Sequence, residues 1–162
     1  GDSFKSNALQ KAVHLASYTN YPIIADDSGL VVDALNGEPG VYSARYAGDE
    51  SNDDDNIDLL LDRMAREKNR KAYFHCSLIY LDPNNTSNPV LIETQWHGII
   101  CSEKSGHKGF GYDPIFFIPE LDKTSAELSV HEKNEYSHRG QAMKLLIERL
   151  RADNIISLKE NL

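Results

Sequence analysis

Two adjacent carboxylates, Asp26 and Asp27, end a short apolar run that starts at Ile23 in the stretch IIADDSGLVVDALNGEPGVYSARY. Ser28 and Gly29 follow them directly. An acid at the end of a strand, beside a residue that lets backbone approach a ligand, is a common way to build a metal or phosphate site. Neighbouring strand residues point to opposite faces, so we expect only one acid to face the site. A structural or capping role is the alternative for either acid.

A second candidate group lies in the stretch GHKGFGYD, which runs from Gly106 to Asp113 and has three glycines within six residues. Closely spaced glycines can bring backbone amides near a ligand, and Phe110 offers a flat stacking face. The stretch is not a Walker loop, because it lacks the GKS or GKT ending. Taken alone it is a weak signal, and a plain loop bordering a strand is the alternative.

A third group contains the cations Lys133, His138 and Arg139, close to the start of the last predicted helix. Cations at a helix N-terminus oppose the helix dipole, so their presence there needs a reason. A bound anion or carbonyl oxygen is one reason, and ion pairs with Glu132 or Glu135 are the other. The remaining histidines show no HxxH or HxxxH spacing, which gives a zinc site little support.

Hydrophobic periodicity predicts the elements that must position these groups. Two long stretches with apolar alternation, joined by the turn-rich segment DPNNTSNP, predict one long antiparallel hairpin. We expect helices at about 4–18, 52–65, 125–128 and 139–151, and strands at 23–26, 72–81, 90–101 and 115–117, with Lys11 near the solvent side of the first helix.

Composition limits the classes to which the chain could belong. Its 162 residues are 40% hydrophobic and 26% charged, which favours one globular domain over residues 1–162. The formal net charge of −8 argues against a general nucleic-acid binder, whose affinity comes from neutralising phosphates. Without an 18-residue apolar run, we expect no membrane partner and a cytoplasmic location. Cys76 and Cys101 lack CxxC spacing and are interpreted as buried thiols.

Three motifs carry a family resemblance that covers nearly the whole chain. ADDSGLVVDALNGEPGVYSARYAG, GFGYDPIF and SHRGQA, in this order and spacing, resemble the inosine triphosphate pyrophosphatase family of non-canonical purine nucleoside triphosphate pyrophosphatases. The resemblance implies that Asp27 is the catalytic carboxylate and a magnesium-site acid. It implies substrate contacts for Ser28, Lys11, Phe110, Gly111, Tyr112, Asp113, Lys133, His138 and Arg139.

The family's fold and activity follow as expectations. The resemblance implies a two-lobed α/β domain, with a mixed sheet built on a long central hairpin flanked by helices, that assembles as a homodimer. It implies Mg²⁺-dependent hydrolysis of ITP, dITP and XTP to the monophosphate and pyrophosphate. A Maf-like pyrophosphatase of other base specificity is one alternative. A nucleotide-binding module without catalysis is the other.

One departure from the family pattern concerns the start of the sequence. Family members open with a phosphate-binding loop of the T/S-x-N-x-x-K type and a strand carrying a metal-ligand Glu, whereas this sequence opens on Gly1 in mid-pattern. We therefore expect the sequence to be part of a longer domain. The alternative is a protein with impaired catalysis.

The base that such a site would read can be argued from hydrogen-bonding groups. A 6-oxopurine presents an N1–H donor beside an O6 acceptor, whereas adenine presents the reverse. Asp113 as acceptor, with His138 and Arg139 as donors, would match the first pattern and oppose the second. Each unpaired buried group costs about 1 to 3 kcal/mol, so two mismatches give a discrimination of roughly a hundredfold or more.

Overall fold

The computed structural model describes residues 1–157, and its helices and strands follow a simple order along the chain. No helix in this part of the chain is long and apolar enough to cross a membrane. The elements are α1 (Phe4–Ala16), β1 (Ile23–Val32), η1 (Asp33–Leu35), η2 (Gly40–Arg45), α2 (Asp53–Arg63), β2 (Lys71–Leu81), β3 (Val90–Ile100), η3 (Asp113–Ile115), β4 (Phe116–Ile118), β5 (Lys123–Thr124), η4 (Ser125–Glu127), α3 (Val130–Tyr136) and α4 (His138–Ala152).

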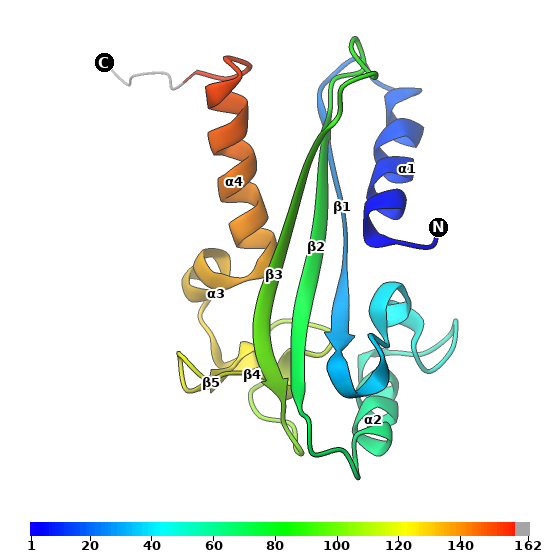
Figure 1. The fold of residues 1–162 in the computed structure, drawn as a ribbon, viewed down its shortest axis with the longest axis vertical. Helices are drawn as coiled ribbons and strands as arrows, with labels where there is room; N and C mark the ends of the chain where they lie inside the picture. The colour runs from blue at the N-terminus through cyan, green and yellow to red at the C-terminus, as the bar shows by residue number, and fades with distance from the viewer. Residues whose placement is uncertain (158–162) are drawn as a thin grey trace.

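A five-stranded sheet in the order β1-β2-β3-β4-β5 forms the centre of the molecule (Figure 1). β2 and β3 form the predicted long hairpin, which is confirmed, as is the α/β class. All four strand pairs are antiparallel. The parallel pairing that a mixed sheet implies is therefore not found among the five described strands, because each strand returns directly beside its predecessor.

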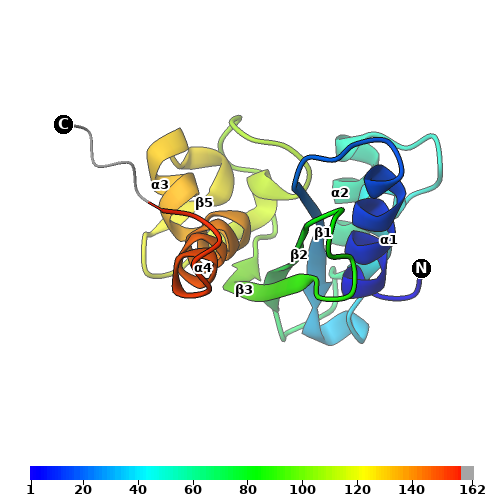
Figure 2. The ribbon, with the colours of Figure 1, turned by 90° about the horizontal axis from the view of Figure 1, so that it is seen from above.

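The helices lie on opposite sides of the sheet, α1 on one side and α3 with α4 on the other (Figures 1 and 2). Side chains alternate along the strands, so each face has its own apolar cluster. On the α1 face Ala8 and Ala12 pack against Ile23, Ala25, Ile79 and Leu81. On the α4 face Ala142, Leu146 and Leu150 pack against Cys76, Leu78 and Tyr80. We call these two sides the α1 face and the α4 face.

The largest apolar cluster fills the other end of the α4 face. It joins β1 and β2 to α2 and to the segment before β4, and Phe116 is fully buried at its centre. Phe74 stacks at a tilt on Phe116 with ring centroids 4.6 Å apart. This cluster includes Tyr112 of the glycine-rich loop, and Ala34 and Leu35 of η1 pack against it.

Two local features differ from the sequence expectation. β1 continues through the acid pair to Val32 instead of ending at Asp26, because its second half is paired residue by residue with β2. α3 was not anticipated, although Ser129 and Glu132 form a capping box at its start that the sequence already contains. Both features bear directly on the site, since they carry the acid pair and Lys133.

Candidate active site

The acid pair is divided between the two faces of the sheet. Asp26 points to the α4 face, where its Oδ2 accepts hydrogen bonds from Arg139 Nε at 2.9 Å and from Ser28 Oγ at 2.8 Å. Asp27 points to the α1 face, where its Oδ1 accepts from Lys11 Nζ at 2.6 Å. The expectation that the two neighbouring acids point to opposite faces is therefore confirmed.

α1 holds both oxygens of the Asp27 carboxylate. Besides Lys11, Asn7 donates its Nδ2 to Asp27 Oδ2 at 2.9 Å, and Lys11 also donates to the Asp26 carbonyl oxygen at 2.9 Å. Asn7 lies one helical turn before Lys11, a spacing that places both side chains on one side of the helix. Sequence reasoning missed Asn7, although this spacing was available as a signal.

A row of polar side chains extends from Asp27 across the α1 face. Asp27 is paired with Ser77 on β2, and Ser77 with Glu93 on β3. Ser77 Oγ donates to Glu93 Oε1 at 3.0 Å and lies 3.0 Å from His75 Nε2. Phe4, at the start of α1, stacks on the His75 ring at 4.8 Å. The row therefore seats α1 on the sheet beside Asp27.

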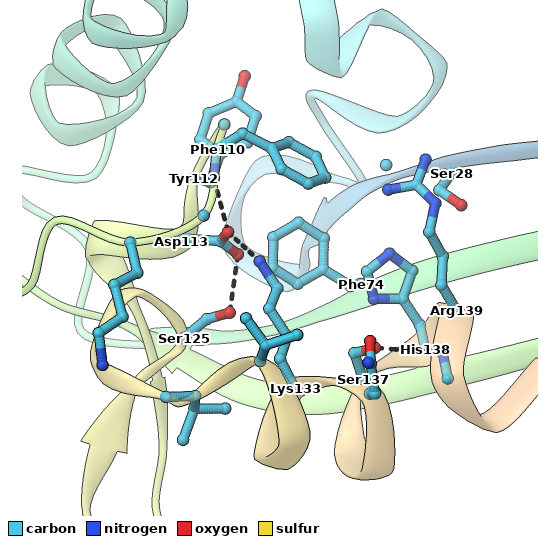
Figure 3. A pocket seen from close by; sticks show the side chains of 18 of the residues that line it. Ser28, Phe74, Phe110, Tyr112, Asp113, Ser125, Lys133, Ser137, His138 and Arg139 are labelled. Carbon is cyan, nitrogen blue, oxygen red and sulfur yellow. Dashed lines mark hydrogen bonds and ion pairs between the residues drawn. The ribbon is translucent and has the colours of Figure 1, made fainter.

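Most of the other candidate residues line one cavity of about 830 Å³ on the α4 face (Figure 3). It is a volume typical of small-molecule sites. The predicted residues among its lining are Ser28, Phe110, Gly111, Tyr112, Asp113, Lys133, His138 and Arg139. Asp27 and Lys11 are not part of this lining, so the structure brings eight of the predicted residues together and sets two apart on the α1 face.

Asp113 is the most heavily engaged acid of the cavity and is only 3% exposed. Its Oδ1 accepts from Ser125 Oγ at 2.7 Å, and its Oδ2 accepts from the Phe110 amide at 2.9 Å. The Lys133 ammonium forms an ion pair with Oδ2. Figure 3 shows these contacts converging on the carboxylate from the loop, from η4 and from α3. A buried carboxylate needs such partners, so this cluster fixes the wall of the cavity.

The glycine-rich loop can take this shape only because Gly109 has no side chain. Its φ is +80°, and a Cβ built there would collide with Asp113 Oδ2. The loop is also tied to α2, since the Gly111 amide donates to Asp53 Oδ2 at 2.6 Å. Phe110 is left 64% exposed, with its ring 4.9 Å from Lys133 Nζ. An exposed aromatic ring beside a cation is suited to stacking on a flat ligand.

Tyr112 faces inward from the same loop. Its side chain is 3% exposed, and its hydroxyl donates to the Ser43 carbonyl oxygen at 2.9 Å. Burial raises the pKa of the Tyr112 phenol well above its ordinary value. Tyr112 therefore contributes an uncharged wall and a tie to η2.

His138 is buried at the start of α4, with only 6% of its surface exposed. Its ring stacks on Phe74 with centroids 4.9 Å apart and an angle of 11°. Burial, and then the nearby Arg139, lower the pKa of the His138 imidazole to about 3, so the ring is neutral at physiological pH. Its Nδ1 is buried without a hydrogen-bond partner among the described residues. A buried polar atom without a partner calls for an explanation, and His138 lines the cavity.

The ion pairs of Lys133 and Arg139 exclude the glutamate alternative for the third candidate group, Lys133, His138 and Arg139, which we call the SHR corner. Lys133 pairs with Asp113, and Arg139 pairs with Asp26. Glu132 pairs with Lys123 instead, and neither Glu132 nor Glu135 forms an ion pair with Lys133 or Arg139 among residues 1–157. Both cations thus face the cavity wall, and local charge neutralisation by those glutamates does not explain them.

The acidic side chains of the described residues limit how a divalent cation could be bound. Among residues 1–157, no group of three or more His, Cys, Asp or Glu side chains is arranged to hold a metal ion. Asp27 offers one carboxylate on the α1 face. Mg²⁺ is commonly bound by one or two carboxylates together with phosphate oxygens and water, so Asp27 fits a site that the substrate completes.

Two further residues were missed by sequence reasoning. Ser125 is buried in η4 and contacts Asp113, and Phe74 stacks on His138. Phe74 belongs to the alternating apolar pattern of β2, which predicts burial but no partner. Nothing in the sequence around Ser125 indicates its contact, because it depends on the packing of η4 against η3.

Comparison with known proteins gives a consistent result. The model of the Ham1 family matches residues 1–149. A dITP/XTP pyrophosphatase of Pectobacterium atrosepticum is 52% identical over 153 residues, which cover 93% of this chain and 78% of the relative. The dITP/XTP pyrophosphatase of Escherichia coli K12 is 50% identical over the same shares of the two chains.

Solved structures agree with the sequence relatives. A HAM1 protein from Coxiella burnetii superposes with a TM-score of 0.88 at 44% identity, covering 94% of this chain and 78% of that one. The Staphylococcus aureus Ham1 protein gives the same TM-score and identity, covering 94% and 79%. The expected family resemblance is thereby confirmed, and the chain belongs to the Ham1 family.

Proposed function

We propose that this chain hydrolyses non-canonical purine nucleoside triphosphates, ITP, dITP and XTP, to the monophosphate and pyrophosphate. The observation that carries the proposal is the pair of the buried acceptor Asp113 and the partly buried donor Lys133, which lies beside the exposed ring of Phe110 in a cavity large enough to hold a nucleobase. The names of the relatives, dITP/XTP pyrophosphatases, support the same substrate class.

The base would bind in the cavity on the α4 face. Phe110 offers its ring for stacking, and Asp113 and Lys133 together present an acceptor beside a donor. This pattern complements N1–H and O6 of a 6-oxopurine and opposes adenine. His138, neutral and with Nδ1 unpaired, and Arg139 supply further polar contacts to the same ligand. The polar groups of the cavity are thus more numerous than the pair of Asp113 and Lys133, and they include Ser28 on β1.

The triphosphate would reach Asp27 and Lys11 on the α1 face. Lys11 provides a positive charge for phosphate oxygens, and Asn7 keeps the Asp27 carboxylate in place. Asp27 would bind the metal ion or accept a proton from the attacking water. A divalent cation, which we propose to be Mg²⁺, supplies charge stabilisation of the phosphates when bound.

Three expectations, the first from the family resemblance and the others from length and composition, stay predictions. They are assembly as a homodimer, a cytoplasmic location without nucleic-acid or membrane partners, and one domain over residues 1–162, of which 158–162 lie outside the described residues.

Pyrophosphate release from a panel of nucleotides tests the proposal. We expect kcat/KM for ITP, dITP and XTP to exceed that for ATP by about a hundredfold or more, because adenine leaves two buried groups unpaired. Equal turnover of ATP would contradict the base assignment. Preference for modified pyrimidines would favour the Maf-like alternative, and ITP binding without pyrophosphate release would favour a module without catalysis.

A further inference from the structure

Ser125 is a buried residue that the proposed mechanism does not use. It is 1% exposed and lines the cavity at the start of η4 (Figure 3). Its Oγ donates to Asp113 Oδ1 at 2.7 Å, while Oδ2 accepts from the Phe110 amide and from Lys133. The two oxygens of one carboxylate are therefore fixed by different parts of the chain.

The turn that carries this serine is held in place on several sides. Thr124 and Glu127 form a capping box around it. The Thr124 hydroxyl donates to the Ser105 carbonyl oxygen at 2.8 Å, and the Lys108 amide donates to the Ala126 carbonyl oxygen at 3.1 Å. The hydroxyl at the start of η4 is consequently a fixed donor rather than one carried by a loose loop.

The number of donors decides which oxygen is left for a ligand. An ionised carboxylate has about four acceptor positions, two on each oxygen. Oδ2 of Asp113 already takes two donors, the Phe110 amide and Lys133, whereas Oδ1 takes only Ser125. The open position therefore belongs to Oδ1, and the direction in which it points is set by the hydroxyl that occupies the other position.

We propose that Ser125 is a specificity-determining positioning residue, which holds the Asp113 carboxylate so that Oδ1 accepts N1–H of a 6-oxopurine. This inference rests on the proposed function. Without the hydroxyl, the carboxylate gains freedom to rotate and a second open position for water. The penalty for placing the unprotonated N1 of adenine against it then falls, so selectivity decreases more than affinity does.

Binding of the product monophosphates IMP and AMP tests this inference without requiring hydrolysis. The two ligands share sugar and phosphate, so the ratio of their Kd values, measured by isothermal titration calorimetry, reports the base alone. We expect Ser125→Ala to lower the preference for IMP about tenfold, the effect of one hydrogen bond to a charged group. Ser125→Thr keeps the hydroxyl and is expected to keep the preference.

Ser105→Ala is the matched control. The Ser105 hydroxyl donates to Glu127 at 2.9 Å near the same turn but does not contact Asp113. We expect this variant to bind with the wild-type ratio. Thermal unfolding shows whether Ser125→Ala folds. If it does not, Ser125→Cys takes its place, because cysteine has a similar size and is a weaker donor. Ser125→Cys should also lower the preference for IMP over AMP.

The outcomes separate the inference from the proposed function. If the wild type prefers IMP and Ser125→Ala changes this preference by less than twofold, the role of Ser125 is overturned while the proposed function stands. An equal loss in Ser105→Ala overturns it as well, because the loss would then come from the turn and not from the hydroxyl. A wild-type chain that binds IMP and AMP alike removes the base selectivity on which both proposals depend.

Discussion

The two faces of the sheet offer a nucleotide very different surroundings. The α4 face has a cavity with stacked aromatic rings and five buried polar residues, Asn56, Asp113, Ser125, Ser137 and His138. The α1 face holds Asp27 between Lys11 and Asn7, beside a polar row that crosses three strands. One face is therefore suited to reading a flat base, and the other to handling charge.

This difference teaches how one strand can serve two kinds of chemistry. Asp26 and Asp27 are neighbours in sequence, yet each belongs to a different face because side chains alternate along β1. Base recognition gains from low exposure, where an unpaired polar group is expensive. Phosphate hydrolysis needs a carboxylate that water and a cation can reach. Separation by the strand allows both conditions within one site.

The largest expected effect comes from the acid on the α1 face. Asp27→Asn keeps the shape of the side chain but removes its negative charge. Its single acceptor oxygen can keep the hydrogen bond with either Lys11 or Asn7. We expect pyrophosphate release from ITP to fall about 10²- to 10⁴-fold, with the Kd for IMP nearly unchanged. A pyrophosphate-release assay measures the turnover of ITP, and isothermal titration calorimetry measures the Kd for IMP.

The neighbouring residue provides the matched comparison. Asp26→Asn weakens the contact with Arg139 on the α4 face. It should raise the Kd for IMP by about fivefold at most, because the ion pair is partly exposed. Near-normal turnover in Asp27→Asn, or a larger loss in Asp26→Asn, would reverse the assignment of the two faces.

The next largest effect concerns stacking in the cavity. Phe110→Ala removes an exposed ring that contributes little to packing. We expect IMP binding to weaken by about 1 to 3 kcal/mol, the usual value for a stacked base, with no change in the thermal transition. Tyr18→Ala, at a 75% exposed aromatic after α1, is the control and should leave IMP binding unchanged. Equal affinity in wild type and Phe110→Ala would remove Phe110 from base binding.

The smallest expected effect is a pH dependence of stability that comes from the buried His138 on the α4 face. The pKa of His138 is lowered to about 3 from an ordinary value of 6.5, so the unfolded chain binds the proton more readily. The neutral His138 imidazole therefore makes its full contribution to the free energy of unfolding above about pH 6.5, and this contribution is lost as the pH falls toward 3. We expect the free energy of unfolding to drop by about 1 kcal/mol between pH 7 and 5.5 from this group.

His138→Phe, which retains an aromatic ring beside Phe74, provides the comparison for that pH effect. Urea titrations at the two pH values should show a smaller pH dependence in the variant than in the wild type. The same dependence in both proteins would mean that His138 is protonated in the folded chain and that the cavity is more accessible to water than its burial indicates.

Local sequence patterns predicted the elements well and their ends less well. The long hairpin and α4 follow from apolar alternation and helical spacing, since these patterns report burial directly. β1 was predicted too short, because polar residues such as Asp26 and Ser28 interrupt its apolar pattern. α3 was missed because its short sequence VHEKNEY contains few apolar residues, despite the capping box at Ser129.

The site divides in the same way. The motifs gave Asp27, the glycine-rich loop and the SHR corner as candidates, and strand alternation alone predicted that Asp26 and Asp27 separate, which the structure confirms. The partners of these residues could not be predicted. Asp113 meets Ser125 and Lys133 from 12 and 20 positions away, and nothing local in the chain encodes such contacts.

By itself, the sequence determined the family, the central hairpin and the residue types that could bind a purine triphosphate. Only the tertiary structure decided that Asp113 is already bound by three protein donors, that His138 is buried and neutral, and that Asp27 lies on the face opposite the cavity. The physical reason is that alternation and spacing are local properties of the chain. Burial and hydrogen-bond partners depend on which distant segments pack together.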